Sequence, residues 1–337
     1  MLTTIEFVVA LVAILLGAAF FTNAIEILGG RLGMRQGAVG SLLAAVGTAL
    51  PESMIAVVAI LEPVLTGKTS EEGALIGIGA ILGAPFMLAT LAMFVVGVSA
   101  LIFRRRRDQG TSLRIDAPTI GRDVEFFLVF FTMAAGVGLV ELPFYLKVVV
   151  ALVLAFGYGL YVRRTLSSGE HLEEVPERLL LLPRREDPPL LAVIFQTLAS
   201  LGVSIAGAHF FVDAVEHTAR GLGLPAGLIA LILAPLATEL PEKFNSIFWM
   251  REGKDTLALG NVTGAMMFQS IVPVAFGVLF TPWNLAPLDL FAVVLALASG
   301  GLVYLSLRLS GKVRAGRLML GGPFYLAFVV GAVIAVL

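Results

Sequence analysis

Long apolar runs separated by short polar segments make up most of this chain. Each run is long enough, at about 20 residues or more, for a helix to cross a hydrocarbon core of roughly 30 Å. The pattern predicts ten membrane-spanning helices, over residues 5–29, 36–61, 73–102, 123–141, 143–163, 190–218, 225–250, 256–281, 284–308 and 315–337. We therefore expect an all-α membrane protein.

A threonine, a proline and a glutamate stand in the middle of the second and of the seventh run. They are Thr48, Pro51 and Glu52 in the second run and Thr238, Pro241 and Glu242 in the seventh. A proline removes one backbone hydrogen bond, so helices 2 and 7 are predicted to be interrupted at the membrane midplane. A glutamate at that depth is costly and usually marks a functional site.

The sequence around the first motif recurs later in the chain. Phe20 and Phe21 reappear as Phe210 and Phe211, and the Thr, Leu, Pro and Glu positions follow at the same offset of 190 without a gap. The repeat predicts that the two halves of the chain share one architecture.

A polar, proline-rich segment, residues 164–189, separates five runs from five others. An odd number of crossings makes the two halves run in opposite directions through the bilayer. We therefore expect two inverted five-helix repeats, residues 1–163 and 190–337, joined by this linker. In transporters built in this way, the substrate site lies near the midplane on interrupted helices.

Basic residues follow the odd-numbered runs. They are Arg31, Arg35, Arg104–Arg107, Arg114, Arg163, Arg164, Arg178, Arg184, Arg185, Arg251, Lys254, Lys312 and Arg314. The positive-inside rule places these loops, the 164–189 linker included, in the cytoplasm and both termini outside. We expect a multi-pass protein of the cell's inner (plasma) membrane.

Composition narrows the function. The 337 residues are 58% hydrophobic and 14% charged, with a mean hydropathy of +0.96, whereas soluble chains are about half apolar and about a quarter charged. The net charge of −1 and the absence of cysteine argue against nucleic-acid partners and thiolate metal sites. No glycine-rich phosphate loop with lysine is present, so ATP hydrolysis is not expected. The expected partners are the lipid bilayer and transported cations, with no cofactor and no soluble protein partner.

The two motifs have the chemistry of a cation site. Thr48 and Glu52 are four residues apart, as are Thr238 and Glu242, so each pair lies on one helix face. If the two faces meet, they form an oxygen-lined site with two negative charges. A hard divalent cation such as Ca²⁺ prefers such ligands.

Glu239, beside the second motif, allows two interpretations. It can pair with Lys243, four residues further on, so that both charges are neutralised within the membrane. Alternatively, it is a third carboxylate of the site, able to bind the cation or to carry a proton, because carboxylates that share a site favour proton uptake. Both interpretations remain open.

These motifs resemble the two alpha-repeats of the cation/calcium antiporter superfamily, which includes the sodium/calcium exchangers. The family pattern is close to Gly-Thr-Ser-Leu-Pro-Glu, and residues 47–52 read Gly-Thr-Ala-Leu-Pro-Glu while residues 237–242 read Ala-Thr-Glu-Leu-Pro-Glu. The resemblance implies that the paired threonines and glutamates line a calcium site.

Several positions depart from the family pattern. The positions whose side chains help to hold sodium in sodium-coupled members are occupied here by Ala49, Glu239, Ala84, Ala265, Leu88 and Gln269. Of these, only Glu239 and Gln269 offer a side-chain oxygen, and both are candidate metal ligands. The departures favour protons over sodium as the counter-ion.

We expect a secondary active antiporter, and not an enzyme, that exchanges Ca²⁺ or a similar divalent cation for H⁺ or Na⁺ by alternating access. One alternative is an intramembrane metal-dependent enzyme that uses Glu52 and Glu242 as a metal-binding or acid/base pair. Against it stand the absence of zinc motifs and of a nucleophile beside a base. Another alternative is a channel, which would pass calcium without a counter-ion gradient.

Overall fold

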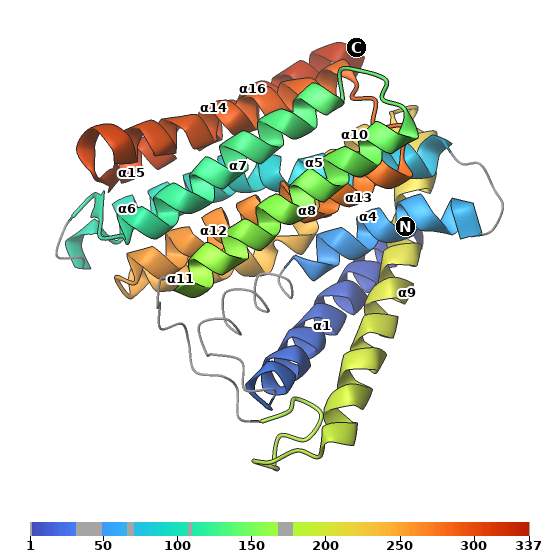
Figure 1. Cartoon of the computed structure of the whole chain (residues 1–337), viewed down its shortest axis with the longest axis horizontal. Helices are drawn as coiled ribbons and strands as arrows, with labels where there is room; N and C mark the ends of the chain where they lie inside the picture. Colours follow the sequence, from blue (N-terminus) through green and yellow to red (C-terminus); the bar gives the residue numbers. More distant parts are fainter. Residues whose placement is uncertain (1, 32–48, 66–70, 107–109, 168–177, 337) are drawn as a thin grey trace.

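The computed structural model describes residues 2–31, 49–65, 71–106, 110–167 and 178–336, and most of these residues are helical (Figure 1). The first half contains α1 (Leu2–Arg31), α4 (Leu50–Leu65), α5 (Glu71–Met87), the π-helical segment η2 (Leu88–Ala92), α6 (Met93–Ile102), the 3-10 turn η3 (Arg104–Arg106), α7 (Ala117–Val137) and α8 (Phe144–Ser167). The second half contains α9 (Leu190–Leu222), α10 (Ala226–Thr238), α11 (Leu240–Arg251), α12 (Asp255–Gln269), α13 (Val272–Phe280), α14 (Pro287–Ser310), α15 (Ala315–Leu318) and α16 (Gly321–Val336).

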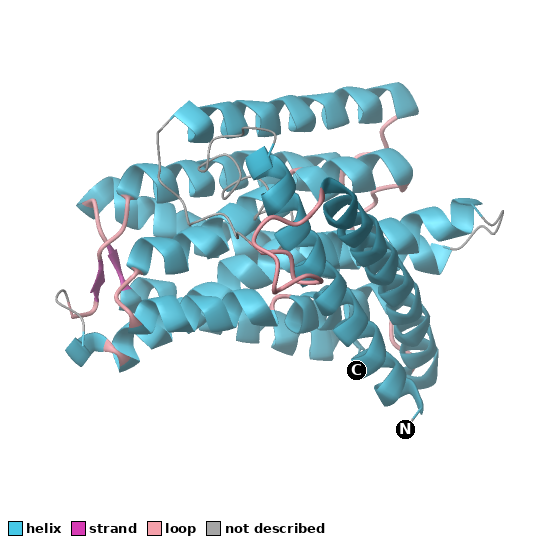
Figure 2. Ribbon diagram, turned by 90° about the horizontal axis from the view of Figure 1, so that it is seen from below, coloured by secondary structure: helices cyan, strands magenta, loops and turns pink. Residues whose placement is uncertain are grey.

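Two short strands tie together loops that are distant in the sequence. Strand β1 (Ser112–Leu113) pairs antiparallel with β2 (Val313–Arg314), and the pair lies at one end of the molecule (Figure 2). Both loops belong to the basic set that the positive-inside rule assigns to the cytoplasmic side. The structure places them together.

The all-helical class is as predicted, and the chain is an integral multi-pass membrane protein. Within the described residues, seven helical stretches are long and apolar enough to cross a membrane: Ile5–Ile25, Glu71–Ile102, Phe144–Thr165, Leu190–Leu222, Asp255–Phe280, Pro287–Ser310 and Ala315–Ala335. The predicted run 36–61 is only partly covered, because residues 36–48 lie outside the described part of the chain.

Several helix boundaries differ from the expected runs by a few residues. Helix α7 begins at Ala117, ahead of residue 123, with a proline in its first turn, a position that proline favours because its missing N–H has no helical partner there. Helix α8 extends to Ser167, into the segment that the sequence predicts as linker.

The most buried spans form the centre of the molecule. In Glu71–Ile102 and Asp255–Phe280, 78% and 72% of the most apolar window is buried, against 22% for Ile5–Ile25 and 28% for Leu190–Leu222. Helices α1 and α9 accordingly lie together at the edge of the helix bundle (Figure 1). The α5–α6 and α12–α13 spans therefore form the core against which the other helices pack.

Helices α1 and α9 form a symmetric antiparallel pair. A Cβ atom at Gly17 would lie 2.2 Å from Ser204 Oγ, and one at Gly207 would lie 2.9 Å from Ile14 Cγ1. Gly17 and Gly207 are related by the offset of 190 found in the sequence, and so are Ile14 and Ser204. Each helix thus uses the same positions to contact the other.

Glycines also bring the backbones of α5 and α10 close together. A Cβ atom at Gly79 would lie 2.2 Å from the Gly227 carbonyl oxygen, and one at Gly83 would lie 2.3 Å from that of Leu231. Only glycine, whose side chain is a hydrogen atom, permits the two backbones to approach so closely. The contact holds α10, which leads into the second motif, against the central span.

Replacing Gly79 with alanine is expected to destabilise the protein by about 1–3 kcal/mol, because the added methyl group meets backbone that cannot rotate away. Gly159→Ala is the matched control, since a methyl group at Gly159 would meet open space, with no contact within 4 Å. Unfolding in detergent by titration with SDS would measure both variants. Equal stability of the two would show that the α5–α10 contact tolerates a side chain.

Candidate functional site

The seventh apolar run is broken within the second motif. Helix α10 ends at Thr238 and α11 begins at Leu240, while Glu239 between them has φ −88° and ψ 7°. Pro241 has no N–H, so it cannot close the helical hydrogen bond to the residue four positions earlier. The first motif matches this arrangement as far as it is described: α4 begins at Leu50, the counterpart of Leu240.

The two central spans are also irregular at matching positions. The first contains the π-helical segment Leu88–Ala92, and the second breaks between Gln269 and Val272. Leu88 and Gln269 align at an offset of 181. Ser299 Oγ donates a 2.5 Å hydrogen bond to the Ala89 carbonyl oxygen in the π segment. Such segments often occur at functional sites.

Glu52 is a buried carboxylate to which no described residue donates a hydrogen bond. It lies in the first turn of α4, 3% of the residue is exposed, and neither side-chain oxygen has a hydrogen-bond partner among the described residues. Thr238 lies beside it, but the Thr238 hydroxyl donates to the Ala234 carbonyl oxygen at 2.8 Å. A buried carboxylate in this situation requires a cation or a proton to offset its desolvation.

Glu239 and Lys243 form a buried ion pair. Lys243 Nζ lies 3.0 Å from Glu239 Oε2, and the lysine and glutamate side chains are 8% and 1% exposed. This confirms the pairing that their spacing predicts. Glu239 Oε1 nevertheless has no partner, and Glu52 lies within electrostatic range of both residues of the pair. Glu239 can therefore be paired and still offer an oxygen to the site.

The other candidate residues are placed less completely. Thr48 lies outside the described residues, as does the side chain of Glu242, whose backbone belongs to α11. Gln269 is buried at the end of α12, a helix that packs against α11, and its Oε1 accepts no hydrogen bond. Among the described side chains, no group of three or more His, Asp or Glu residues could hold a metal ion. The structure thus brings Glu52, Thr238 and Glu239 together.

A buried aspartate outside the predicted set of site residues fixes α12 from the side. Asp123 of α7 accepts hydrogen bonds from Tyr161 of α8 at 2.9 Å and from Thr263 of α12 at 2.8 Å. Asp123 is the first residue of the predicted run 123–141. Its acidic side chain at the edge of an apolar run is the only sequence feature that indicates its role. The network anchors the helix that carries Gln269 to two neighbours.

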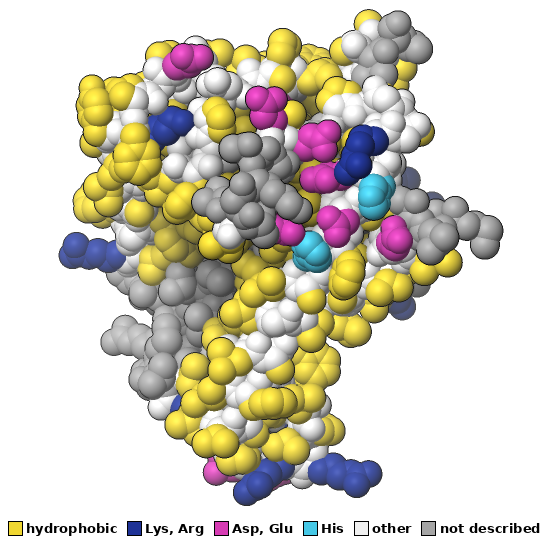
Figure 3. All heavy atoms as spheres, turned by 90° about the vertical axis from the view of Figure 1, so that its right-hand side faces the viewer, with side chains coloured by type: hydrophobic (Ala, Val, Ile, Leu, Met, Phe, Trp, Pro, Cys, Tyr) yellow, Lys and Arg dark blue, Asp and Glu magenta, His cyan; other side chains and the backbone are white. Residues whose placement is uncertain are grey.

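Acidic and histidine side chains gather on the face shown in Figure 3. His209 Nδ1 of α9 lies 2.8 Å from Glu62 Oε2 of α4, and its Nε2 lies 3.5 Å from Asp213 Oδ2. Glu62 is on the same helix as Glu52. The cluster therefore joins the helix that carries Glu52 to a helix at the edge of the bundle.

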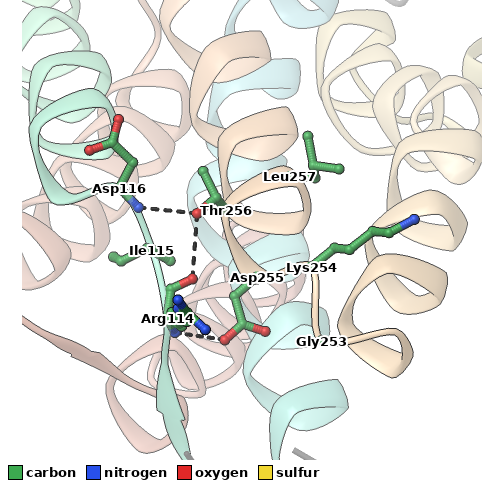
Figure 4. A pocket seen from close by; sticks show the side chains of 8 residues that line it. All are labelled: Arg114, Ile115, Asp116, Gly253, Lys254, Asp255, Thr256 and Leu257. Carbon is green, nitrogen blue, oxygen red and sulfur yellow. Dashed lines mark hydrogen bonds between the residues drawn. The ribbon is translucent and has the colours of Figure 1, made fainter. Parts of the chain in front are cut away.

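A separate pocket of about 480 Å³ lies where the loop after β1 meets the start of α12 (Figure 4). The Arg114 amide donates to Asp255 Oδ2 at 2.7 Å, and the Asp116 amide donates to Thr256 Oγ1 at 3.1 Å. Arg114 and Lys254 give the pocket positive charge beside its carboxylates. These contacts tie together two of the loops that the sequence predicts to be cytoplasmic.

The chain matches the family model for sodium/calcium exchanger proteins over residues 2–166 and 192–337. It is 30% identical to the sodium/calcium exchanger MaX1 of Methanosarcina acetivorans over 140 residues, which are 41% of this chain and 39% of that protein. It is 22% identical to the inner membrane protein YrbG of Escherichia coli over 86% of this chain and 83% of that protein.

Solved exchanger structures share the fold. The H⁺/Ca²⁺ exchanger CAX superposes with a TM-score of 0.73 at 18% identity, over 97% of this chain and 81% of that one. The sodium-calcium exchanger NCX_Mj superposes with a TM-score of 0.59 at 21% identity, over 98% of both chains. The family and its structural neighbours are transporters, not enzymes.

Proposed function

The chain belongs to the sodium/calcium exchanger protein family, and we propose that it is a secondary active antiporter that exchanges Ca²⁺ or a similar divalent cation for H⁺ or Na⁺. The observation that carries the proposal is Glu52, a buried carboxylate with both oxygens unpartnered. It lies beside Thr238 at the break between α10 and α11. Carboxylates and freed carbonyls are the oxygen ligands that Ca²⁺ prefers.

The proposed ligands come from both halves of the chain. Glu52 and Glu242 supply charge, Thr48 and Thr238 supply neutral oxygens, and Gln269 is a further candidate whose Oε1 is free. Glu239 contributes the carboxylate oxygen that Lys243 does not occupy. The ion is the cargo of the protein, and no cofactor is needed.

Two inverted repeats of five helices, residues 1–163 and 190–337, underlie this arrangement. The symmetric contacts of α1 with α9 support a two-fold relation between the halves, as do the matching starts of α4 and α11. The full plan has ten membrane-spanning helices, of which the second and seventh are interrupted at the midplane. The 164–189 linker lies in the cytoplasm, and both termini lie on the opposite, outer side of the inner membrane.

Alternating access would be provided by the edge helices. Helices α1 and α9 pack mainly on each other and also contact α4 and α10, which adjoin the site. A joint movement of this pair across the central spans would open the site to one side of the membrane and then to the other.

Protons are the counter-ion that the side chains favour. Ala49, Ala84, Leu88 and Ala265 are all buried, at 0% to 4% exposure, and none offers a side-chain oxygen. Sodium would need several oxygens at these places. A proton needs only a carboxylate, and Glu52 and Glu239 lie within electrostatic range of each other.

Calcium efflux from proteoliposomes tests the proposed function. We expect a pH gradient alone to drive calcium uphill and a protonophore to abolish this movement. Uphill calcium movement driven by a sodium gradient alone, with the protonophore present, would show that the counter-ion is sodium and not the proton. Calcium movement that needs neither gradient and never runs uphill would indicate a channel and contradict antiport.

A further inference from the structure

A positive charge of the protein lies inside the proposed cation site. Lys243 Nζ lies 3.0 Å from Glu239 Oε2, with the lysine side chain 8% exposed and the glutamate side chain 1% exposed. Glu52 lies within electrostatic range of the same ammonium. The Lys243 ammonium thus binds one carboxylate oxygen of Glu239, next to Glu52, which we propose as the main ligand.

The pair does not link two parts of the fold. Glu239 immediately precedes Leu240, the first residue of α11, and Lys243 lies in the first turn of that helix. The ion pair therefore joins residues one helical turn apart and holds no distant helix in place. A buried pair of this kind is often no more stabilising than well-packed neutral residues of similar size. Stability alone gives little reason for two buried charges here.

The location of the pair suggests a different role. An ammonium group on a flexible stem is a compact cation that can compete with a metal ion for a carboxylate. It also repels any other cation that approaches Glu52. Glu239 keeps Oε1 without a partner while Oε2 holds the lysine. A second cation could therefore bind Oε1 of Glu239 but would have to displace Lys243 to bind Oε2.

We propose that Lys243 is a built-in competitor of the transported cation. Its ammonium holds Glu239 while the site has no cargo, and it weakens the binding of the divalent cation so that the cargo can leave. Transport requires binding that is favourable enough for entry and weak enough for release. This inference rests on the proposed function, because it concerns the affinity of that same site.

Calcium titrations at one fixed pH test the inference. We expect Lys243→Met to lower the Kd for calcium by at least about tenfold, because a repelling charge is lost and a carboxylate oxygen is released. Lys243→Gln should act in the same direction, and its amide can still donate to Glu239, so this variant serves if Lys243→Met does not fold. Lys254→Met is the matched control, since Lys254 is 55% exposed and pairs with Glu252; its Kd should match that of the wild type.

The double variant Glu239→Gln/Lys243→Met separates the two effects of the lysine. If Lys243 competes for Glu239, the double variant should bind calcium at least about tenfold more weakly than Lys243→Met, because the released carboxylate is gone. Folded Lys243→Met or Lys243→Gln protein that binds calcium no more tightly than the wild type would overturn the inference and leave the antiport proposal standing. Wild-type protein that binds no divalent cation would overturn both.

Discussion

Replacing Glu52 with glutamine is expected to weaken calcium binding by at least about 100-fold, because a divalent ion loses one of its charged ligands in a medium of low dielectric constant. The fold should persist. Glu52 is buried and accepts no hydrogen bond from the described residues, so the loss of its charge breaks no hydrogen bond there and relieves a desolvation penalty. Isothermal titration calorimetry in detergent would measure the affinity, and SDS titration would measure the stability.

The control for this variant is Glu125→Gln. Glu125 has the same chemistry but is 52% exposed on α7, where it lies 3.7 Å from Arg308. Its calcium affinity should equal that of the wild type. If Glu52→Gln bound calcium with wild-type affinity, Glu52 would not be a ligand of the site.

Replacing Glu239 with glutamine is expected to destabilise the protein by about 3–5 kcal/mol, because the buried ammonium of Lys243 would lose its partner. Glu239→Gln should therefore lower the stability of the protein, whereas Glu52→Gln should leave the fold intact, although the two carboxylates lie close together. SDS titration of both variants under the same conditions would show the difference.

The double variant Glu239→Gln/Lys243→Met is the control for this second prediction. It removes both charges at once, so no unpaired ion remains, and its stability should return to within about 1 kcal/mol of the wild type. A stable Glu239→Gln protein would mean that Lys243 has another partner or does not need one.

Local sequence signals predict the main irregularity of the site. Pro241 in an apolar run indicates the break that the structure places at Glu239. The four-residue spacing of Glu239 and Lys243 indicates their ion pair. Both features depend on residues within one or two helical turns of each other. For that reason a single stretch of sequence is sufficient to predict them.

Other features depend on partners far away in the chain. The π segment Leu88–Ala92 is supported by Ser299, which lies in the other half of the chain and donates to the Ala89 carbonyl oxygen. Asp123 is bound by Thr263, also in a helix of the other half. Neither pairing leaves a periodic signal in the sequence. These parts of the site become visible only when the helices are packed together.

The position of a bound divalent cation tests the account most directly. Crystals soaked in strontium, a heavier relative of calcium, would locate the ion by anomalous scattering. We predict one strong peak within about 2.3–2.6 Å of a Glu52 carboxylate oxygen, close to the break between α10 and α11. A peak only in the pocket lined by Arg114, Asp116 and Asp255, with none near Glu52, would contradict the account.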